Sequence, residues 1–247
     1  MSDNPLPAFR KQIDDIDDRI IDLLLERTEV IARVGEWKRA TFPGQCPMRA
    51  GREASQIRRV MEKFDGSKFS PVAAAAMWRI LIGSSVSIES PLSLSIYAPS
   101  DDDTFFWLAR EYFGPVLPIS KQPHVNRVIG DVKDAKASIG IVPTLQSDDN
   151  SNWWSGLLSQ DGPKIFARIP FVSDGIPGKY HAGLAIAHIT PEDSGNDVSL
   201  MVFDADHNVS QHKLQTLFAK ENLSARWINI ASPDASTRRH LIEIKGF

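Results

Sequence analysis

The sequence has a single cysteine in 247 residues and no strong excess of either charge. Cys46 has no second cysteine to pair with, so a disulfide scaffold is excluded and a reducing cytoplasm is the expected location. Lysine and arginine number 28 against 31 aspartates and glutamates, which gives a formal net charge of −3. No broad electropositive surface is expected, and nucleic acid is therefore not an expected partner.

Long apolar runs are also lacking. The longest run, residues 72–82, is interrupted by Arg79 and is shorter than the roughly 20 residues that cross a bilayer. The first residues, MSDNPLPAFRKQ, lack the apolar core of a signal peptide. The composition, 42% hydrophobic and 24% charged, is typical of globular proteins. We therefore expect a soluble protein without a membrane partner.

The first ninety residues predict three helices. Pro5 opens the first helix, and the turn at residues 41–44 ends it, which predicts a helix over roughly residues 5–40 and about 50 Å long. Two further helices are predicted over about residues 49–64 and 71–90. The first helix carries an apolar stripe at steps of three, four or seven residues, formed by Phe9, Ile13, Ile16, Ile20, Leu24, Ile31 and Val34. A rod of this length cannot bury such a stripe alone.

The pattern changes to α/β after Pro91. The sequence predicts strands over residues 92–97, 138–142, 165–172 and 183–189, and helices over 104–113 and 124–135. A loop over residues 190–197 then leads to a strand, a helix and two strands over 198–203, 211–221, 225–231 and 239–244. The predicted fold class is multidomain α and α/β, with domains over residues 1–90, 91–190 and 191–247.

Three cations on the first helix are candidate ligands for an anion. Arg27 and Lys38 are eleven residues apart, about three turns, so they project from nearly the same face, in register with the apolar stripe. Arg10 precedes Arg27 by seventeen residues, about 25 Å along the rod, and is rotated from it by about 100°. If Arg10 and Arg27 hold one small molecule, they must come from two chains with antiparallel helices.

Further polar residues follow on the next two helices, namely Arg52, Glu53, Ser85 and Glu89. Each taken alone could be a solvated group on a structural bundle. Together with the three cations they can line a pocket that suits a small dianion with an additional hydroxyl. The set contains no nucleophile with an adjacent base and no metal-ligand cluster, so neither covalent nor metal-assisted chemistry is expected.

The residues quoted above resemble the all-helical class of chorismate mutases. The matching segments are FRKQIDDID at residues 9–17, LLER at 24–27, VGEWK at 34–38 and the pair Arg52-Glu53. The resemblance spans residues 5–90 and implies an intertwined all-α homodimer with two shared active sites. It also implies a cofactor-free [3,3] rearrangement of chorismate to prephenate, a step in the biosynthesis of phenylalanine and tyrosine.

The resemblance implies a role for each cation. Arg10 of one chain and Arg27 of the other bind the two substrate carboxylates. Lys38 contacts a carboxylate and the ether oxygen of the breaking bond, while Arg52 and Ser85 help to hold the anion.

Two acidic residues complete the implied site. Glu53 matches the residue that accepts a hydrogen bond from the ring hydroxyl, and the short segment Ala50-Gly51 before Arg52 supplies no further acid. Glu89 matches a position where the family has glutamine or glutamate beside the ether oxygen. An ionised carboxylate would repel that oxygen, so Glu89 can donate only when protonated, and we expect activity to be favoured at acidic pH.

The second half resembles two other families more weakly. Residues 125–145 are similar to part of a prephenate dehydratase domain, but Ala182-Gly183-Leu184 replaces the Thr-Arg-Phe of that family, so dehydration is not expected. Residues 196–247 resemble the start of an ACT-type regulatory domain, with a truncated strand-helix-strand-strand order. Binding of an effector such as phenylalanine, docking of a pathway enzyme and a merely structural remnant all stay open.

Two functions other than chorismate mutase activity are also compatible with these residues. An isochorismate pyruvate-lyase on the same helical scaffold would use a similar cationic pocket. A non-catalytic regulatory subunit that binds aromatic metabolites would share the pocket but would show no turnover.

Overall fold

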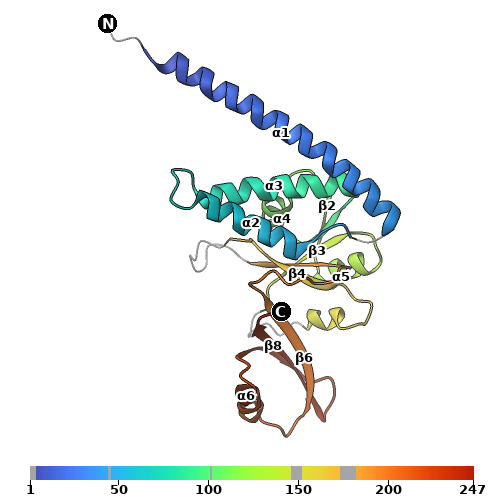
Figure 1. The fold of residues 1–247 in the computed structure, drawn as a ribbon. Helices are drawn as coiled ribbons and strands as arrows, with labels where there is room; N and C mark the ends of the chain where they lie inside the picture. The colour runs from blue at the N-terminus through green and yellow to red at the C-terminus, as the bar shows by residue number, and fades with distance from the viewer. Residues whose placement is uncertain (1–3, 44–45, 101, 146–151, 173–181) are drawn as a thin grey trace.

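The structure is a computed structural model of the chain and describes residues 4–43, 46–100, 102–145, 152–172 and 182–247. Three helices come first, followed by a five-stranded sheet and then a three-stranded sheet (Figure 1). The helices are α1 (Leu6–Thr41), α2 (Ala50–Phe64), α3 (Pro71–Glu89), α4 (Thr104–Phe113), α5 (Val125–Lys133), the short 3-10 helix η1 (Trp153–Leu157) and α6 (Gln211–Lys220). The strands are β1 (Leu94–Tyr97), β2 (Ile119–Gln122), β3 (Ile139–Pro143), β4 (Lys164–Ile169), β5 (Gly183–Ala187), β6 (Val198–Asp206), β7 (Ala225–Ala231) and β8 (Thr237–Lys245).

The predicted fold class, helices followed by α/β structure, is confirmed. The three N-terminal helices begin and end within one or two residues of their predicted bounds, although Gly44 of the first predicted turn lies outside the described residues. Strand β2 and helix η1 were not predicted. Among the described residues, strand β2 pairs with β1 alone, and it has one apolar residue, so it lacks the alternation by which a half-buried strand is recognised.

The five-stranded sheet has the order β2-β1-β3-β5-β4 and is mixed. Strands β1, β2 and β3 run parallel, while β5 pairs antiparallel with both β3 and β4. One face of this sheet packs on α4 and on the helices α2 and α3. The buried side chains of that layer include Ile57, Ile82, Ile96, Phe105 and Ile141. The helical segment and the sheet therefore share one hydrophobic core.

The opposite face of the sheet packs on α5, η1 and the C-terminal sheet. The buried side chains of this second layer include Val128, Trp154, Ile186, Ile228 and Leu241. The C-terminal sheet has the order β6-β8-β7, and α6 covers its other face, where Phe218 packs on Phe203 and Trp227. The predicted strand-helix-strand-strand order is confirmed.

One side of helix α3 lies in the hydrophobic core. By length and composition it is the one helix in the described part of the chain that could cross a membrane. It instead packs against α1, α2 and α4, and its central Arg79 is buried in an ion pair with Glu53. Gly83 lies so close to the carbonyl oxygen of Phe113 in α4 that a side chain there would overlap it. This close contact fixes α3 against the α/β region.

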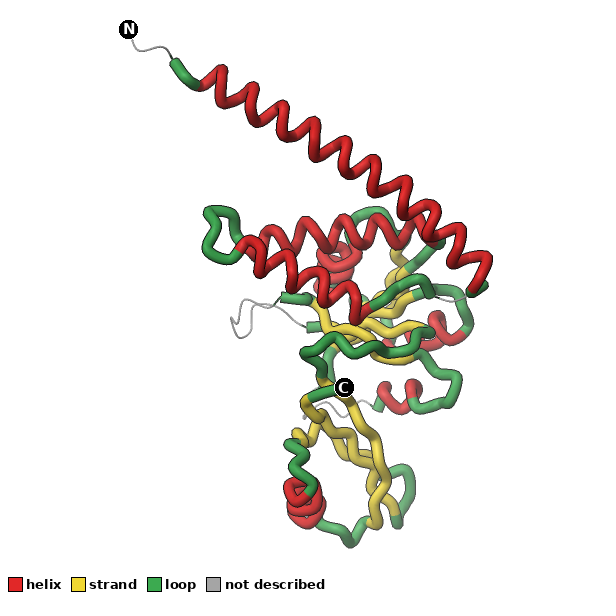
Figure 2. The backbone as a smooth tube through the Cα atoms, in the orientation of Figure 1, coloured by secondary structure: helices red, strands yellow, loops and turns green. Residues whose placement is uncertain are grey.

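Helix α1 is packed along only half of its length. Figures 1 and 2 show its N-terminal half projecting away from the rest of the chain. Its C-terminal half lies on α3, where Gly35 is buried. The apolar side chains of the projecting half are about half exposed, namely Phe9 (54%), Ile13 (55%), Ile16 (51%) and Ile20 (49%). The predicted stripe is therefore present, and its first half stays about half exposed in the part of the chain that the structure describes.

His240 on β8 is buried inside the C-terminal sheet. Its Nδ1 atom accepts a hydrogen bond from the indole N–H of Trp227 at 3.2 Å, and its ring stacks on Phe203. Its Nε2 atom is buried without a hydrogen-bond partner in the part of the chain that the structure describes. Burial lowers the pKa of His240 below its ordinary value of 6.5, and the positive charge of Arg238 acts in the same direction.

This lowered pKa predicts a loss of stability in mild acid. Below pH 6.5 the unfolded chain binds a proton at His240 that the folded chain resists, so the free energy of unfolding falls as the pH drops through that value. We expect the urea midpoint to decrease between about pH 7.5 and 5.5, and to decrease less in His240→Gln, which has no titratable group there. An equal decrease in both proteins would contradict this role for His240.

Candidate active site

The stripe of α1 that lies on α3 carries two of the predicted cations. Arg27 is half-buried, and its Nη1 atom donates to the hydroxyl oxygen of Ser85 at 2.6 Å. Ser85 in turn donates to the carbonyl oxygen of Leu81. Burial lowers the pKa of the Arg27 guanidinium, and the negative charge of Glu89 opposes this effect. An arginine remains charged after such a shift, so Arg27 presents a fixed cation toward α3.

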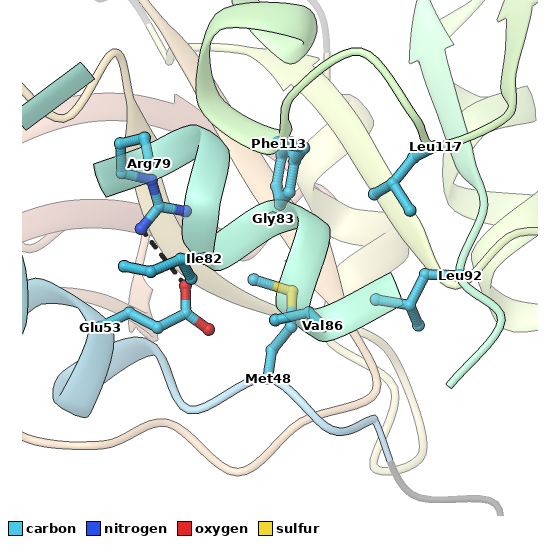
Figure 3. Close-up of a pocket in the computed structure, with 9 residues that line it drawn as sticks. All are labelled: Met48, Glu53, Arg79, Ile82, Gly83, Val86, Leu92, Phe113 and Leu117. Atoms are coloured by element: carbon cyan, nitrogen blue, oxygen red, sulfur yellow. Dashed lines mark hydrogen bonds and ion pairs between the residues drawn. The ribbon is translucent and has the colours of Figure 1, made fainter. Parts of the chain in front are cut away.

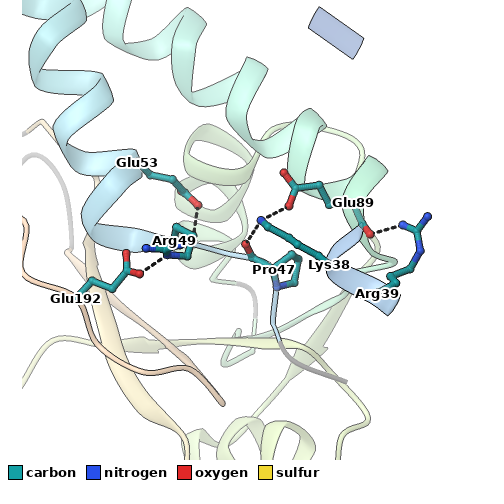
Figure 4. Close-up of polar contacts among 7 residues, drawn as sticks. All are labelled: Lys38, Arg39, Pro47, Arg49, Glu53, Glu89 and Glu192. Atoms are coloured by element: carbon teal, nitrogen blue, oxygen red, sulfur yellow. Dashed lines mark hydrogen bonds and ion pairs between the residues drawn. The ribbon is translucent and has the colours of Figure 1, made fainter. Parts of the chain in front are cut away.

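Lys38 lies three turns further along the same face of α1. Its Nζ atom forms an ion pair with Glu89 at the end of α3 and donates to the carbonyl oxygen of Pro47 at 3.0 Å (Figure 4). The two helices approach closely here, because a Cβ atom on Gly35 would lie 2.7 Å from the Cα atom of Glu89. Arg39 also donates to the backbone carbonyl of Glu89. Lys38 and Glu89 are thus held together by the backbone packing of α1 on α3.

Glu53, in the first turn of α2, is buried. One carboxylate oxygen accepts from the backbone N–H of Arg49, and the other accepts from Nη1 of Arg79, both at 3.3 Å. The Arg79 guanidinium lies over the ring of Tyr112 and donates to its backbone carbonyl. Burial raises the pKa of the Tyr112 hydroxyl. The carboxylate of Glu53 is therefore fixed by α3 and, through Arg79, by α4.

A small cavity lies beside this ion pair (Figure 3). Glu53 and Arg79 lie at one end, and apolar side chains, among them Met48, Val86 and Leu117, line the rest. Its free volume is about 10 Å³, room for about one water molecule. This cavity is too small for an organic substrate.

The structure does not bring all seven predicted residues together. Arg27, Lys38, Ser85 and Glu89 form one cluster between α1 and α3. Glu53 lies nearby on α2, but Arg52 is on the exposed face of that helix. Arg10 is exposed on the projecting half of α1. Neither Arg10 nor Arg52 forms a hydrogen bond or ion pair with any residue that the structure describes.

The cluster suits a small anion. Arg27 and Lys38 offer several N–H donors on the side of α1 that faces α3, and Ser85 adds a hydroxyl that can donate or accept. A ligand carboxylate that reaches Lys38 would compete with its present partner Glu89. The ion pair between Lys38 and Glu89 could therefore be replaced by an ion pair between Lys38 and the ligand carboxylate.

Three contacts of the site were not predicted from the sequence, namely those of Arg79, of the Pro47 carbonyl and of the Arg49 side chain. Arg79 had a signal, because a cation in the middle of an apolar helix is expected to find a buried partner. The carbonyl of Pro47 and the side chain of Arg49 had none. The Pro47 carbonyl reaches Lys38 because of the geometry of the loop, and Arg49 pairs with Glu192, which is 143 positions away.

Comparison with known families agrees with the helical cluster. Residues 9–90 match the family model described as chorismate mutase type II. This segment contains α1 from Phe9 onward and all of α2 and α3, with every candidate residue named above. Residues 9–90 are a chorismate mutase type II domain.

Relatives of this chorismate mutase domain extend beyond it. The chain is 30% identical over 139 residues to a bifunctional chorismate mutase/prephenate dehydratase of Aquifex aeolicus (strain VF5), across 56% of this chain and 38% of that protein. It is 27% identical over 150 residues to the protein of the same name from Stutzerimonas stutzeri, across 59% and 40% of the two chains. The chain thus spans about two-fifths of the length of these relatives. Both alignments are longer than the domain itself, so the similarity continues into the α/β region.

The alignment with a solved structure, the prephenate dehydratase from Streptococcus mutans, covers 62% of this chain and 82% of that one. The TM-score is 0.45 and the sequence identity 17%. This score is too low to establish a shared fold.

The buried pair of Glu53 and Arg79 predicts a sharp effect of a single substitution. Arg79→Met leaves the Glu53 carboxylate buried without its cation and is expected to cost roughly 3–5 kcal/mol of unfolding free energy. The double variant Glu53→Leu/Arg79→Met, which removes both charges, should recover most of that loss. Urea unfolding checks both values, with Arg59→Met on the exposed face of α2 as the control. An Arg79→Met cost no larger than that of the control would contradict the pairing.

Proposed function

We propose that the chain is a homodimeric chorismate mutase that converts chorismate to prephenate. The observation that carries the proposal is the cluster of Arg27, Lys38, Ser85 and Glu89 between α1 and α3, within the segment that matches the mutase family. The proposed division of the chain is a mutase domain over residues 1–90, a reduced dehydratase-like region over 91–190 and a truncated ACT-like region over 191–247. The single Cys46, half-buried and free, is compatible with a reducing cytoplasm.

The reaction is unimolecular, so the protein has to fold the substrate and stabilise charge in the transition state. Arg27 binds one carboxylate of chorismate, and Lys38 binds the other edge of the molecule, where the ether bond breaks. Two fixed cations hold the flexible enolpyruvyl arm over the ring, which removes most of the entropic part of the barrier. Negative charge that develops on the ether oxygen is stabilised by Lys38 and by Glu89 in its protonated form.

The remaining candidates surround this core. Ser85 orients Arg27 and can contact the substrate carboxylate, while Glu53 accepts from the ring hydroxyl through lone pairs not used by Arg49 and Arg79. Arg52 would turn inward to hold the anion. A millionfold acceleration would need about 8 kcal/mol of differential stabilisation, a sum within reach of several charge-assisted hydrogen bonds in a dry pocket.

A second copy of the chain would complete the site. The apolar side chains of the projecting half of α1, from Phe9 to Ile20, are about half exposed, and burying each would contribute of the order of 1–2 kcal/mol. Exposed apolar residues of α3, among them Val72, Met77 and Ile80, offer a complementary surface. Antiparallel pairing of two α1 helices would bring Arg10 of the partner subunit to the cluster around Arg27.

The shared site predicts complementation between two inactive variants. Arg10→Ala and Arg27→Ala chains should each lose at least about a hundredfold in kcat/KM, because each lacks one carboxylate contact. In a mixed dimer one of the two sites has both arginines intact. Co-refolding equal amounts should therefore restore about a quarter of the parent activity.

The measurement is the loss of chorismate absorbance, with product analysis from both chorismate and isochorismate to separate a mutase from a pyruvate-lyase. Mixing Arg27→Ala with itself is the control. Activity no higher in the mixture than in either variant alone would contradict a site built from two chains.

Glu89 predicts a second, independent result. Because it can donate to the ether oxygen only when protonated, turnover should rise toward acidic pH. Glu89→Gln, which donates at every pH, should flatten the profile and preserve turnover near neutrality. Initial rates measured across about pH 4 to 9 check this, with Glu62→Gln on the exposed face of α2 as the control. A profile that is unchanged by Glu89→Gln would rule out the role.

A further inference from the structure

The connector between β5 and β6, residues 190–197, lies on the first turn of α2. A Cβ atom built on Gly51 would lie 2.6 Å from the carbonyl oxygen of Asp193 and 2.9 Å from the Cβ atom of Glu192. Both separations are shorter than real Cβ contacts, so only glycine leaves room for the connector. The absence of a side chain at Gly51 is therefore explained by a segment more than 140 positions away.

Two arginines of this region hold the connector in place. Arg49 forms an ion pair with Glu192 through its Nε atom (Figure 4), and Arg58 donates to the carbonyl oxygen of Ser194. The Glu192 side chain is 25% exposed, so this ion pair is partly shielded from solvent. These contacts place the connector against the first turn of α2, the turn that carries Arg52 and Glu53.

The connector is itself braced against the C-terminal sheet. The backbone N–H and the hydroxyl of Ser194 donate to the carboxylate of Asp197 at 2.8 and 2.7 Å. The backbone N–H of Gly246, just beyond β8, donates to the carbonyl oxygen of Asp197 at 2.9 Å. The connector is thus held at one end by the C-terminal sheet and at the other by α2.

Arg49 links the connector to the candidate active site. Its side chain pairs with Glu192, while its backbone N–H donates to the carboxylate of Glu53. Arg79 holds only the other carboxylate oxygen of Glu53. The orientation of Glu53 therefore depends on where the first turn of α2 is held.

We infer that Glu192 is a positioning residue for the mutase site, acting through Arg49 on Glu53. The inference rests on the proposed function, in which Glu53 accepts from the ring hydroxyl of the substrate. Glu192 itself touches no substrate. Without it, the Arg49 end of α2 is released and Glu53 loses a fixed hydrogen-bond donor, which weakens the contact to the hydroxyl in both ground state and transition state.

The kinetic test uses the full chain and chorismate. Glu192→Ala should raise KM about three- to tenfold while kcat changes less than about twofold, since uniform binding is lost. Arg49→Ala should do the same, and the double variant should add little, because the two side chains act as one unit. Glu192→Gln, which still offers an oxygen to Arg49, should recover part of the effect.

The matched control is Glu243→Ala. Glu243 forms an ion pair with Arg226 and is also 25% exposed, but it lies on the C-terminal sheet away from α2. Its substitution should leave KM unchanged. A fall in kcat with unchanged KM in Glu192→Ala would indicate a loss of folded protein and would overturn the inference.

A second readout does not depend on turnover. Amide hydrogen exchange over residues 50–54 should be faster in Glu192→Ala and in Gly51→Ala than in the parent chain. Gly130→Ala on α5, where a Cβ atom meets nothing within 4 Å, is the control and should leave this exchange unchanged. If the parent chain does not convert chorismate, the proposed function fails and the exchange still decides whether the connector holds α2. Unchanged exchange and unchanged KM in Glu192→Ala would overturn the inference.

Discussion

The central constraint on this protein is that helix α1 cannot bury its apolar stripe within one chain. The stripe runs the length of a 36-residue helix, yet only its second half lies on α3. The four stripe residues from Phe9 to Ile20 stay about half exposed, which is costly for a monomer in water. The same geometry carries Arg10 away from Arg27. One constraint thus accounts both for the exposed stripe and for the distance of Arg10 from the cluster around Arg27.

The second half of α1 shows how the fold accommodates charged side chains in a partly buried site. Gly35 lets α1 approach the backbone of Glu89, and this approach places Lys38 against the Glu89 carboxylate. Each charge in the interior has a partner, either an opposite charge or a hydroxyl, so the site is stable without a ligand. The α/β region contributes through the core it shares with α3 and through the connector on α2. The mutase domain is therefore supported by the rest of the chain.

Much of this architecture was predictable from the sequence. The proline and turn signals predicted the ends of the three helices within one or two residues, and the spacing of Arg27 and Lys38 placed both in register with the apolar stripe of α1. The buried partner of Glu53 was not predicted, because the place of Arg79 in an apolar helix signals that it needs a buried partner but not which helix supplies that partner. The contact of Glu192 with Arg49 depends on tertiary packing over 143 positions, which no periodicity records. Strand β2 was missed because an edge strand needs little apolar surface.

The central claim, that α1 is completed by a second copy, is tested most directly by the mass of the chain in solution. Sedimentation equilibrium at concentrations where chorismate is consumed should give twice the chain mass of 27.5 kDa. Replacing Ile16 by aspartate in the exposed stripe should shift that mass to a single chain and abolish turnover together. A fully active protein with the mass of one chain would contradict the account.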